Sequence, residues 1–234
     1  MPFGALTRTW SRFGIQVKTT TATAAAVAGR SRVNDPDATK ANILDVATRE
    51  FAELGFDGAR IDAIAEQTKT SKRMLYYYFK NKRGLYQAVL VNYYVKLRKA
   101  EGEIDLDDLT ALEAVQKMTE STFDYHMKNA DVVRLVMVEN IAKGRHMDEL
   151  PSLAPLNSVL INDLKKVCDR GLKEGTMRKL NPTRLYMSIA ALCFFNVSNR
   201  YTFQSIFKVD MTSTKAANAR KAEVVEMILR YVRP

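Results

Sequence analysis

The chain contains few of the residues and patterns on which most enzymes and membrane proteins depend. Its 234 residues include two histidines and two cysteines, and no glycine-rich loop of the phosphate-binding kind. The longest unbroken apolar run, 189–195, has seven residues, whereas a membrane-spanning helix needs about 20. The sequence therefore excludes an integral membrane protein. It also predicts no catalytic residue, no metal ligand and no cofactor, because no nucleophile has a base to activate it.

The cysteines and the net charge indicate a compartment and a class of partner. Cys168 and Cys193 both lie among apolar residues, which favours reduced core side chains over a disulfide. With 36 Lys and Arg against 26 Asp and Glu, the net charge is +10 and the isoelectric point is near 9.6. We expect a bacterial cytoplasmic protein with a polyanionic partner, either nucleic acid or an acidic membrane surface. Charge alone does not choose between these two.

The N-terminal segment has an unusual composition. The first 34 residues contain five cations and no acid, and the Thr/Ala tract 19–28 has neither helical nor strand periodicity. We expect residues 1–36 to be a disordered basic extension. It would be a flexible arm that adds non-specific DNA affinity or an extension from an upstream start codon. A mitochondrial transit peptide is the alternative, and the lack of an apolar core excludes a secretory signal.

Three short segments between residues 37 and 83 have the apolar spacing of helices. The first has a candidate N-cap at Thr39 and a left-handed stop at Gly55. The second ends near Thr68, and the third begins near Ser71. Their inward faces are Ile43, Leu44, Ala47, Phe51 and Leu54 in the first, Ile61, Ile64 and Ala65 in the second, and Leu75 and Phe79 in the third. Three such helices predict a small trihelical core.

The turn between the second and third helices carries the strongest functional signal. Ser71 is a good N-cap, and the helix end behind it, with unpaired N–H groups and a positive dipole, also suits a DNA phosphate. Lys72 and Arg73 follow in the first turn, and the tyrosines 76–78 come within two turns. Residues 60–83 hold seven cations and two acids, which is half of the net charge of the chain. A solvated basic face is the alternative, but the turn and the aromatic residues favour DNA recognition.

These features form an ordered series of motifs between residues 39 and 86. In chain order they are Ile43-Leu44, Ala47, Gly55-Phe56, Ile64-Ala65, Ser71, Leu75-Tyr76-Tyr77-Tyr78-Phe79 and Lys82-Arg83-Gly84-Leu85. Together they resemble the DNA-binding domain of TetR-type transcriptional regulators. The resemblance implies a helix-turn-helix domain at residues 37–99, a homodimer, and a double-stranded DNA operator that is roughly palindromic.

Four residues depart from the pattern of that family. Arg60 stands where a capping Thr is usual, so a phosphate contact by Arg60 would substitute for it. Lys69 replaces the turn glycine, at a cost of about 1 kcal/mol if it is left-handed. Arg73 replaces a frequent glycine, and Tyr78 replaces a histidine. Because these positions touch DNA in the family, its base-reading pattern is not transferred to this chain.

Chemistry assigns the roles of the expected DNA contacts. Lys72 and Arg73 would read base edges, since an arginine fork can bind guanine, and Lys82 would bind a backbone phosphate. Tyr77 and Tyr78 would meet thymine methyls or phosphates, whereas Tyr76 would pack with Leu75 and Phe79. The full predicted set is Arg60, Thr70, Ser71, Lys72, Arg73, Tyr77, Tyr78 and Lys82.

The rest of the chain also has helical patterns, and no alternating run indicates a strand. The expected helices are 82–101, which links two domains, then 109–127, 132–141, 153–172, 182–203 and a last helix through 219–232. The fold class is therefore all-α, with residues 100–234 as a helical effector-binding and dimerisation domain. The helix 185–201 is apolar nearly all round, so it must be buried on two sides. The expected dimer contacts are Tyr186, Ala190, Phe194, Val225 and Leu229.

By the same resemblance, the C-terminal domain encloses a small-molecule effector. The candidate pocket residues are Phe123, His126, Met137, Asn140, Phe195 and Asn199, and the alternative for the polar ones is an ordinary hydrogen-bonded core group. Residues 138–146 and 199–203 are similar to repressors of catabolic operons. This similarity implies an aromatic or heterocyclic acid as effector, paired with a buried Arg145 or Arg200.

The sequence thus predicts a sequence-specific DNA-binding repressor that a small molecule releases from its operator. A transcriptional activator of the same fold is the alternative. An enzyme, or a membrane-surface protein with an incidental basic face, is the other class. Two isolated histidines argue against the enzyme, and the tyrosines 76–78 leave no broad apolar face for a membrane.

Overall fold

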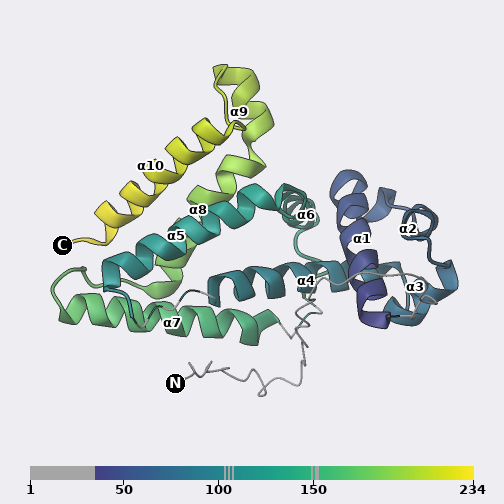
Figure 1. Ribbon diagram of the computed structural model, residues 1–234, viewed down its shortest axis with the longest axis horizontal. Coiled ribbons are helices and arrows are strands. Elements are labelled where there is room, and N and C mark those ends of the chain that lie inside the picture. Colours follow the sequence, from purple (N-terminus) through teal and green to yellow (C-terminus); the bar gives the residue numbers. More distant parts are fainter. Residues whose placement is uncertain (1–34, 103, 105, 107, 149, 151–152) are drawn as a thin grey trace, which may run out of the picture. The chain divides into compact units, whose positions relative to one another are not determined.

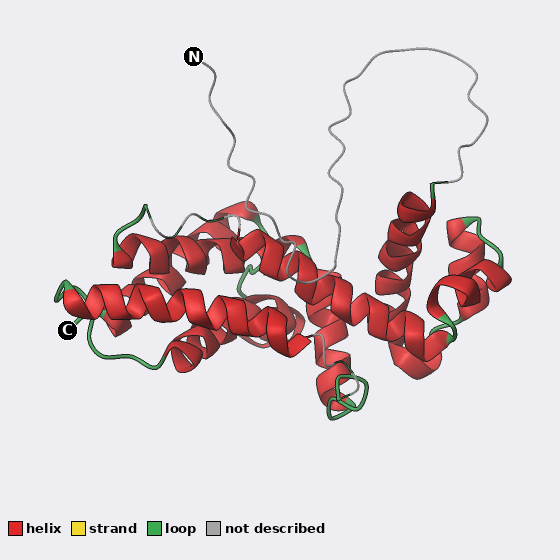
Figure 2. Cartoon of the chain, turned by 90° about the horizontal axis from the view of Figure 1, so that it is seen from below, coloured by secondary structure: helices red, strands yellow, loops and turns green. Residues whose placement is uncertain are grey.

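The computed structural model describes residues 35–102, 104, 106, 108–148, 150 and 153–234. The expected basic extension lies, as far as residue 34, outside the described residues. Residues 36–234 form one compact unit. Its described part consists of helices joined by loops and turns, without a strand, which confirms the predicted all-α class (Figure 2).

Ten helices are defined within the described residues. They are α1 (Pro36–Gly58), α2 (Ile61–Thr68), α3 (Lys72–Phe79), α4 (Lys82–Gly102), α5 (Ala111–Lys128), α6 (Ala130–Ile141), α7 (Leu153–Lys173), α8 (Pro182–Ser198), α9 (Arg200–Phe207) and α10 (Thr214–Val232). The predicted division at residues 99 and 100 falls inside α4.

The first helix starts earlier than the sequence indicated. It begins at Pro36, whose fixed φ suits the first helical position, so Thr39 lies inside the helix rather than at its N-cap. Gly55 has a φ of 70°, which confirms the predicted left-handed position and bends the end of α1.

A close approach of backbones joins α3 to α4. A Cβ atom at Gly84 would lie 2.1 Å from the Phe79 carbonyl oxygen, so only glycine allows α4 to begin against the end of α3. The Asn81 side chain accepts a hydrogen bond from the Gly84 N–H at 2.8 Å and so caps this end of α4. The corner fixes the direction of α3 relative to the long helix α4.

Two apolar cores hold the unit together. The first contains side chains of α1, α2, α3 and the first half of α4, with Leu135 of α6 added to it. The second contains side chains of α5, α7, α8 and α10. Figure 1 shows α4 extending from the α1–α3 group to α5 and α7, and the contacts of α4 with both groups agree. One long helix therefore contributes side chains to the first core and contacts two helices of the second.

The eighth helix confirms one prediction and corrects another. Asn181 accepts a hydrogen bond from the Arg184 N–H, and Pro182 is the first helical residue, as the sequence predicted. The helix does not continue to Phe203, however. It ends at Ser198, and α9 begins at Arg200 after a break at Asn199.

Candidate functional site

The α2–turn–α3 segment presents the start of α3 to solvent. Lys69, left-handed with a φ of 52°, follows α2, and Ser71 in an extended conformation precedes α3. The Ser71 hydroxyl accepts a hydrogen bond from the Met74 N–H at 3.2 Å, which confirms the predicted N-cap. The first turn of α3 is therefore an exposed, electropositive helix end of the kind that binds phosphate.

The two cations in the first turn of α3 have different surroundings. Lys72 Nζ lies 3.0 Å from Asp62 Oδ1 of α2, and this hydrogen-bonded pair raises the pKa of Lys72. Arg73 is exposed and forms no ion pair within the part of the chain that the structure describes. Because the Lys72–Asp62 pair is exposed and screened by water, Lys72 can exchange Asp62 for another anion.

Two of the three tyrosines of α3 are not placed as the sequence indicated. Tyr77 is 76% exposed and points into solvent. Tyr78, an expected DNA contact, is half-buried and packs against the first core. Tyr76, which was expected to pack, is 39% exposed. Because α3 has only eight residues, one face buries Leu75 and Phe79 and leaves Tyr76 at its edge.

The remaining expected DNA contacts lie around this surface. Arg60 is exposed at the start of α2, where it gives the helix no side-chain cap, and its own N–H donates to Glu50 Oε1 of α1 at 3.2 Å. Thr70 is half-buried and donates to the Thr68 carbonyl. Lys82 Nζ donates to the Asp57 carbonyl at 3.0 Å and lies over the Phe56 ring. Lys82 is therefore engaged within the protein.

Only part of the expected effector pocket is buried. Phe123 and His126 lie in the interior, and Met137 is half-buried. Asn140, Phe195 and Asn199 are exposed, so the structure corrects their assignment to a pocket. Arg145 is also exposed and pairs with Asp57 of α1 at 3.4 Å, so it is not a buried partner for a carboxylate. Asn140 and Asn199 lie at or beyond helix ends, where helical periodicity does not predict burial.

A different set of polar side chains meets inside the helical domain. We call it the Arg98 cluster: Arg98 and Glu101 of α4, Thr122 and His126 of α5, and Tyr186 of α8. Arg98 Nη1 lies 2.5 Å from Glu101 Oε2, and Arg98 Nη2 donates to the Tyr186 hydroxyl at 2.5 Å. The Tyr186 hydroxyl donates in turn to Glu101 Oε1 at 3.2 Å. Arg98 and Glu101 are buried, with exposed fractions of 9% and 4%.

Burial shifts the protonation of this cluster. It raises the pKa of Glu101 to about 7, although the Arg98 charge opposes the shift. It lowers the pKa of His126 to about 4, and the Arg98 charge adds to that shift. The sequence held one signal of the cluster that we missed. Glu101 continues the four-residue spacing of Leu85, Val89 and Tyr93 along the buried face of α4, where an acid is out of place.

A second buried polar cluster joins α4 to the segment after α6. Glu139 Oε1 accepts from the His146 N–H at 2.8 Å, and Glu139 Oε2 accepts from the Tyr86 hydroxyl at 3.0 Å. The same Oε2 lies 2.9 Å from His146 Nδ1. The rings of Tyr86 and His146 also contact Phe56 near the end of α1. Buried hydrogen bonds thus join α4 to α6 and to the segment after α6, and the ring contacts add Phe56 of α1.

The exposed face of α8 is displaced by one position along the helix from the predicted dimer contacts Tyr186, Ala190 and Phe194. Tyr186 belongs to the Arg98 cluster, and the Phe194 ring packs edge-to-face on His126 at 5.7 Å, so both point inward. Met187 and Phe195 are the large exposed apolar residues of α8, and Ala191 between them is exposed. A helix that is apolar all round does not reveal by sequence which face is outward.

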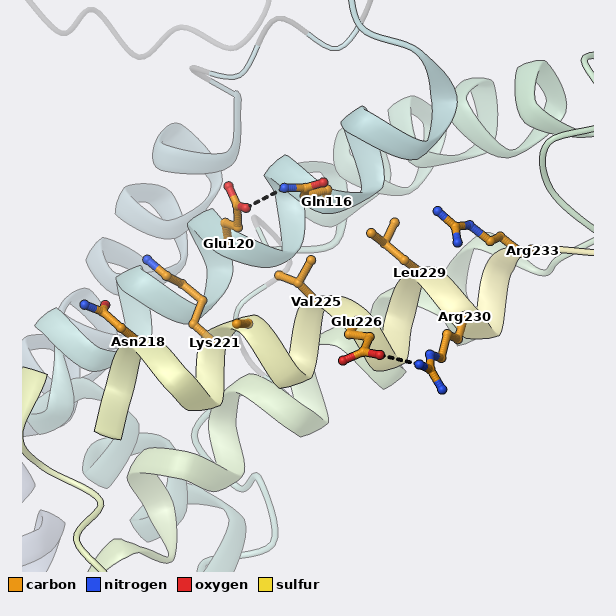
Figure 3. A pocket seen from close by; sticks show the side chains of 10 residues that line it. Gln116, Glu120, Asn218, Lys221, Val225, Glu226, Leu229, Arg230 and Arg233 are labelled. Atoms are coloured by element: carbon orange, nitrogen blue, oxygen red, sulfur yellow. Dashed lines mark hydrogen bonds and ion pairs between the residues drawn. The ribbon is translucent and has the colours of Figure 1, made fainter. Parts of the chain in front are cut away.

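The expected dimer residues of α10 lie beside a groove. Val225 is buried and Leu229 is half-buried, and both line a groove of about 470 Å³ between α5 and α10 (Figure 3). Charged side chains surround them there, among them Glu120, Lys221 and Arg230. The exposed apolar residues of α10 are instead Met227 and Tyr231.

Comparison with known proteins identifies the family. Residues 43–89 match the model of bacterial regulatory proteins of the tetR family, and residues 112–228 match the tetracyclin repressor-like C-terminal domain. The chain belongs to the TetR family. A TetR-family relative, the HTH-type transcriptional repressor NicS of Pseudomonas putida, is 30% identical over 203 residues, which cover 86% of this chain and 96% of NicS.

Two further relatives agree with the TetR assignment. The HTH-type transcriptional regulator RutR of Escherichia coli is 29% identical over 155 residues, covering 66% of this chain and 71% of RutR. The crystal structure of SCO4942 from Streptomyces coelicolor superposes with a TM-score of 0.64 at 26% identity, covering 84% of this chain and 99% of that one. The TetR-family chain is thus a DNA-binding transcriptional regulator, as its sequence predicted.

Membrane-spanning helices and metal-ligand clusters are both absent from the described residues. No described helix of this TetR-family chain combines the length and apolar composition that a bilayer crossing requires. Within the described residues, no three His, Cys, Asp or Glu side chains lie together as candidate metal ligands. Cys168 and Cys193 are free and buried, and burial raises the pKa of both thiols.

Proposed function

We propose that this chain is a dimeric repressor that leaves a palindromic operator when a small molecule binds its helical domain. The observation that carries the proposal is the exposed, capped start of α3, with Arg73 and Tyr77 free to enter a DNA groove. The relatives named as repressors support the direction of regulation. A bacterial cytoplasm is where such a protein would meet its operator.

On DNA, each side chain of the surface has a distinct role. Arg73 presents its guanidinium fork to a base edge, which is worth about 1–3 kcal/mol of discrimination against a wrong base. Lys72 exchanges Asp62 for a phosphate or a base, and Arg60 and the start of α3 behind Ser71 bind the backbone. These backbone contacts set the position of the protein without reading sequence. Lys82 would join them only by leaving the Asp57 carbonyl.

The proposed dimer interface uses the outer faces of α8 and α10. Its centre is the exposed apolar stripe of Met187, Ala191 and Phe195, flanked by Met227 and Tyr231 of α10. A two-fold axis through this surface gives an isologous interface, in which each copy buries the same stripe. Two copies of α3 would then read half-sites about 34 Å apart.

The effector acts on DNA binding through the contacts that α6 and the segment after it make with α1 and α4. The ion pair of Arg134 with Glu53 joins α6 to α1, and the ion pair of Arg145 with Asp57 joins the segment after α6 to α1. The Tyr86–Glu139 hydrogen bond lies beneath them. A movement of α6 on ligand binding would therefore turn α1 and with it the α2–α3 pair.

The direct experiment is footprinting of the purified protein on the DNA upstream of its own gene and of neighbouring genes. The expected result is a protected, roughly palindromic site, and small metabolites are then screened for release. Protection that is absent from every neighbouring promoter would count against local regulation. A protected site that lacks two-fold symmetry would contradict the dimer.

A further inference from the structure

The Arg98 cluster contains hydrogen-bonding groups that the protein itself does not use. Among the described residues, Arg98 Nε and His126 Nδ1 are buried and have no hydrogen-bond partner. Most buried polar atoms in proteins have a partner, because an unpaired one costs about 1–3 kcal/mol. The buried guanidinium therefore has donor capacity beyond its contacts with Glu101 and Tyr186.

We propose that Arg98 anchors the carboxylate of a small aromatic acid, which takes the place at the guanidinium that the Glu101 carboxylate holds. This inference rests on the proposed control of DNA binding by a small molecule, and it names the chemical class of that molecule. It replaces Arg145 and Arg200 as the arginine that meets the acid.

The chemistry of the guanidinium selects a carboxylate. Arginine stays charged in proteins, and a buried charge requires an anion beside it. A carboxylate matches the planar fork with two parallel hydrogen bonds, and one of these would use a donor that Glu101 leaves free. An uncharged ligand would leave Glu101 as the only anion beside Arg98, and it would not form these charge-assisted hydrogen bonds.

Glu101 is suited to give way to an entering acid. Its pKa of about 7 means that it takes up a proton near neutral pH and then no longer needs the guanidinium. The other titratable groups that face the pair are Tyr93 and Tyr94 of α4, Tyr125 and His126 of α5, and Tyr186 of α8. Burial keeps all five uncharged at neutral pH, so Glu101 is the group that takes the proton.

The rings around Arg98 favour an aromatic body on the acid. Arg98 lies over the Tyr186 ring at 5.0 Å, and the His126 ring contacts the Phe194 and Tyr125 rings at 5.7 and 6.3 Å. Aromatic rings prefer such offset and edge-to-face neighbours, which contribute about 0.5–1.5 kcal/mol beyond area burial. A planar ring would replace one of these contacts with another of the same kind.

The test measures binding directly and does not depend on DNA. Benzoate and the three pyridine monocarboxylates, each beside its uncharged amide, are titrated at millimolar concentration into the full-length protein by calorimetry. The proteins are the wild type, Glu101→Gln and the double variant Arg98→Gln/Glu101→Gln, which removes both buried charges together. The control is Arg220→Gln/Glu223→Gln, which removes an Arg–Glu pair of the same spacing from the surface of α10.

The expected result is that at least one acid binds, and that it binds about 10- to 100-fold more tightly than its uncharged analogue. Glu101→Gln should bind that acid more tightly than the wild type, the Arg98 double variant should lose binding by a similar factor, and the control should match the wild type. Above pH 7, binding to the wild type should take up about one proton, and binding to Glu101→Gln should take up none. If Glu101→Gln does not fold, the proton uptake and the preference of the wild type for the acid decide the question.

Three outcomes would overturn the inference: no acid binds, acid and amide bind equally, or the Arg98 double variant keeps its affinity for the acid. Parallel gel shifts on the footprinted DNA separate this inference from the proposed function. An acid that binds through Arg98 but leaves DNA affinity unchanged would establish the site and refute the control of DNA binding. DNA that is bound normally while every acid fails would refute the site alone.

Discussion

The start of α3 and the Arg98 cluster each contain an arginine, but one is exposed and the other is buried. Arg73 is exposed and forms no ion pair with a described residue, whereas Arg98 is 9% exposed and contacts both Glu101 and Tyr186. An exposed arginine contributes little to stability and remains available to a partner. A buried arginine is tied to its counter-ion, and removal of either leaves an uncompensated charge. The two sites should therefore respond to mutation in different measurements.

The largest expected effect is on the free energy of unfolding when the buried Arg98 is replaced. Arg98→Met should lower the free energy of unfolding at pH 8 by about 3–5 kcal/mol, because Glu101 is left charged and unpaired in the interior. Arg73→Met, which is its surface counterpart, should change it by about 0.5 kcal/mol at most. Urea unfolding of both variants measures the difference. Equal effects would show that the burial of Arg98 carries no electrostatic consequence.

The dependence of stability on pH tests the protonation of the buried Glu101 carboxylate. Because burial raises its pKa from 4.5 to about 7, the folded protein binds this proton more tightly than the unfolded chain. The resulting stability is fully present below pH 4.5 and is lost as the pH rises through 7, in total about 3 kcal/mol. The wild type should therefore lose more stability than Glu101→Gln between pH 5 and pH 8.

The same series has an internal control. His126, whose pKa is lowered to about 4, destabilises the fold as the pH falls below 6.5, but it does so in both proteins and cancels in their difference. Parallel stability curves for the wild type and Glu101→Gln would contradict the raised pKa.

The smallest effect is expected at the cap of α3. Ser71→Ala should lower the free energy of unfolding by about 1 kcal/mol, since the Met74 N–H loses its partner at a helix start. The matched substitution Ser158→Ala lies inside α7, where the hydroxyl donates to the Ala154 carbonyl, and it should be neutral or slightly stabilising. Equal values for the two variants in urea unfolding would argue that Ser71 is no cap.

The sequence predicted the local structure around the start of α3 well because its signals are local. The Ser71 cap, the left-handed Lys69 and the inward Leu75 and Phe79 each depend on residues a few positions away. The same holds for the positive φ of Gly55, although α1 bends there and continues to Gly58. Local rules failed only where two faces compete, as for Tyr76 and Tyr78 on the short helix α3.

The partners within the two buried clusters could not be predicted, because they are far apart in the chain. The contact between Arg98 and Tyr186 spans 88 residues and that between Tyr86 and Glu139 spans 53. Periodicity also left the rotation of α8 undetermined, so Tyr186 was assigned to the outer face of the helix, where Met187 and Phe195 are exposed. Which side of an all-apolar helix faces inward depends on its neighbours, and these are set by the whole fold.

The most direct test of the central claim, that the start of α3 reads DNA, is duplex binding as a function of salt. Wild type and Arg73→Ala are compared on the footprinted site and on an unrelated duplex. Affinity should fall steeply with salt for both proteins. Arg73→Ala should lose about 10- to 100-fold on the footprinted site and much less on the unrelated duplex. A salt slope near zero, or a variant with an unchanged sequence preference, would contradict the claim.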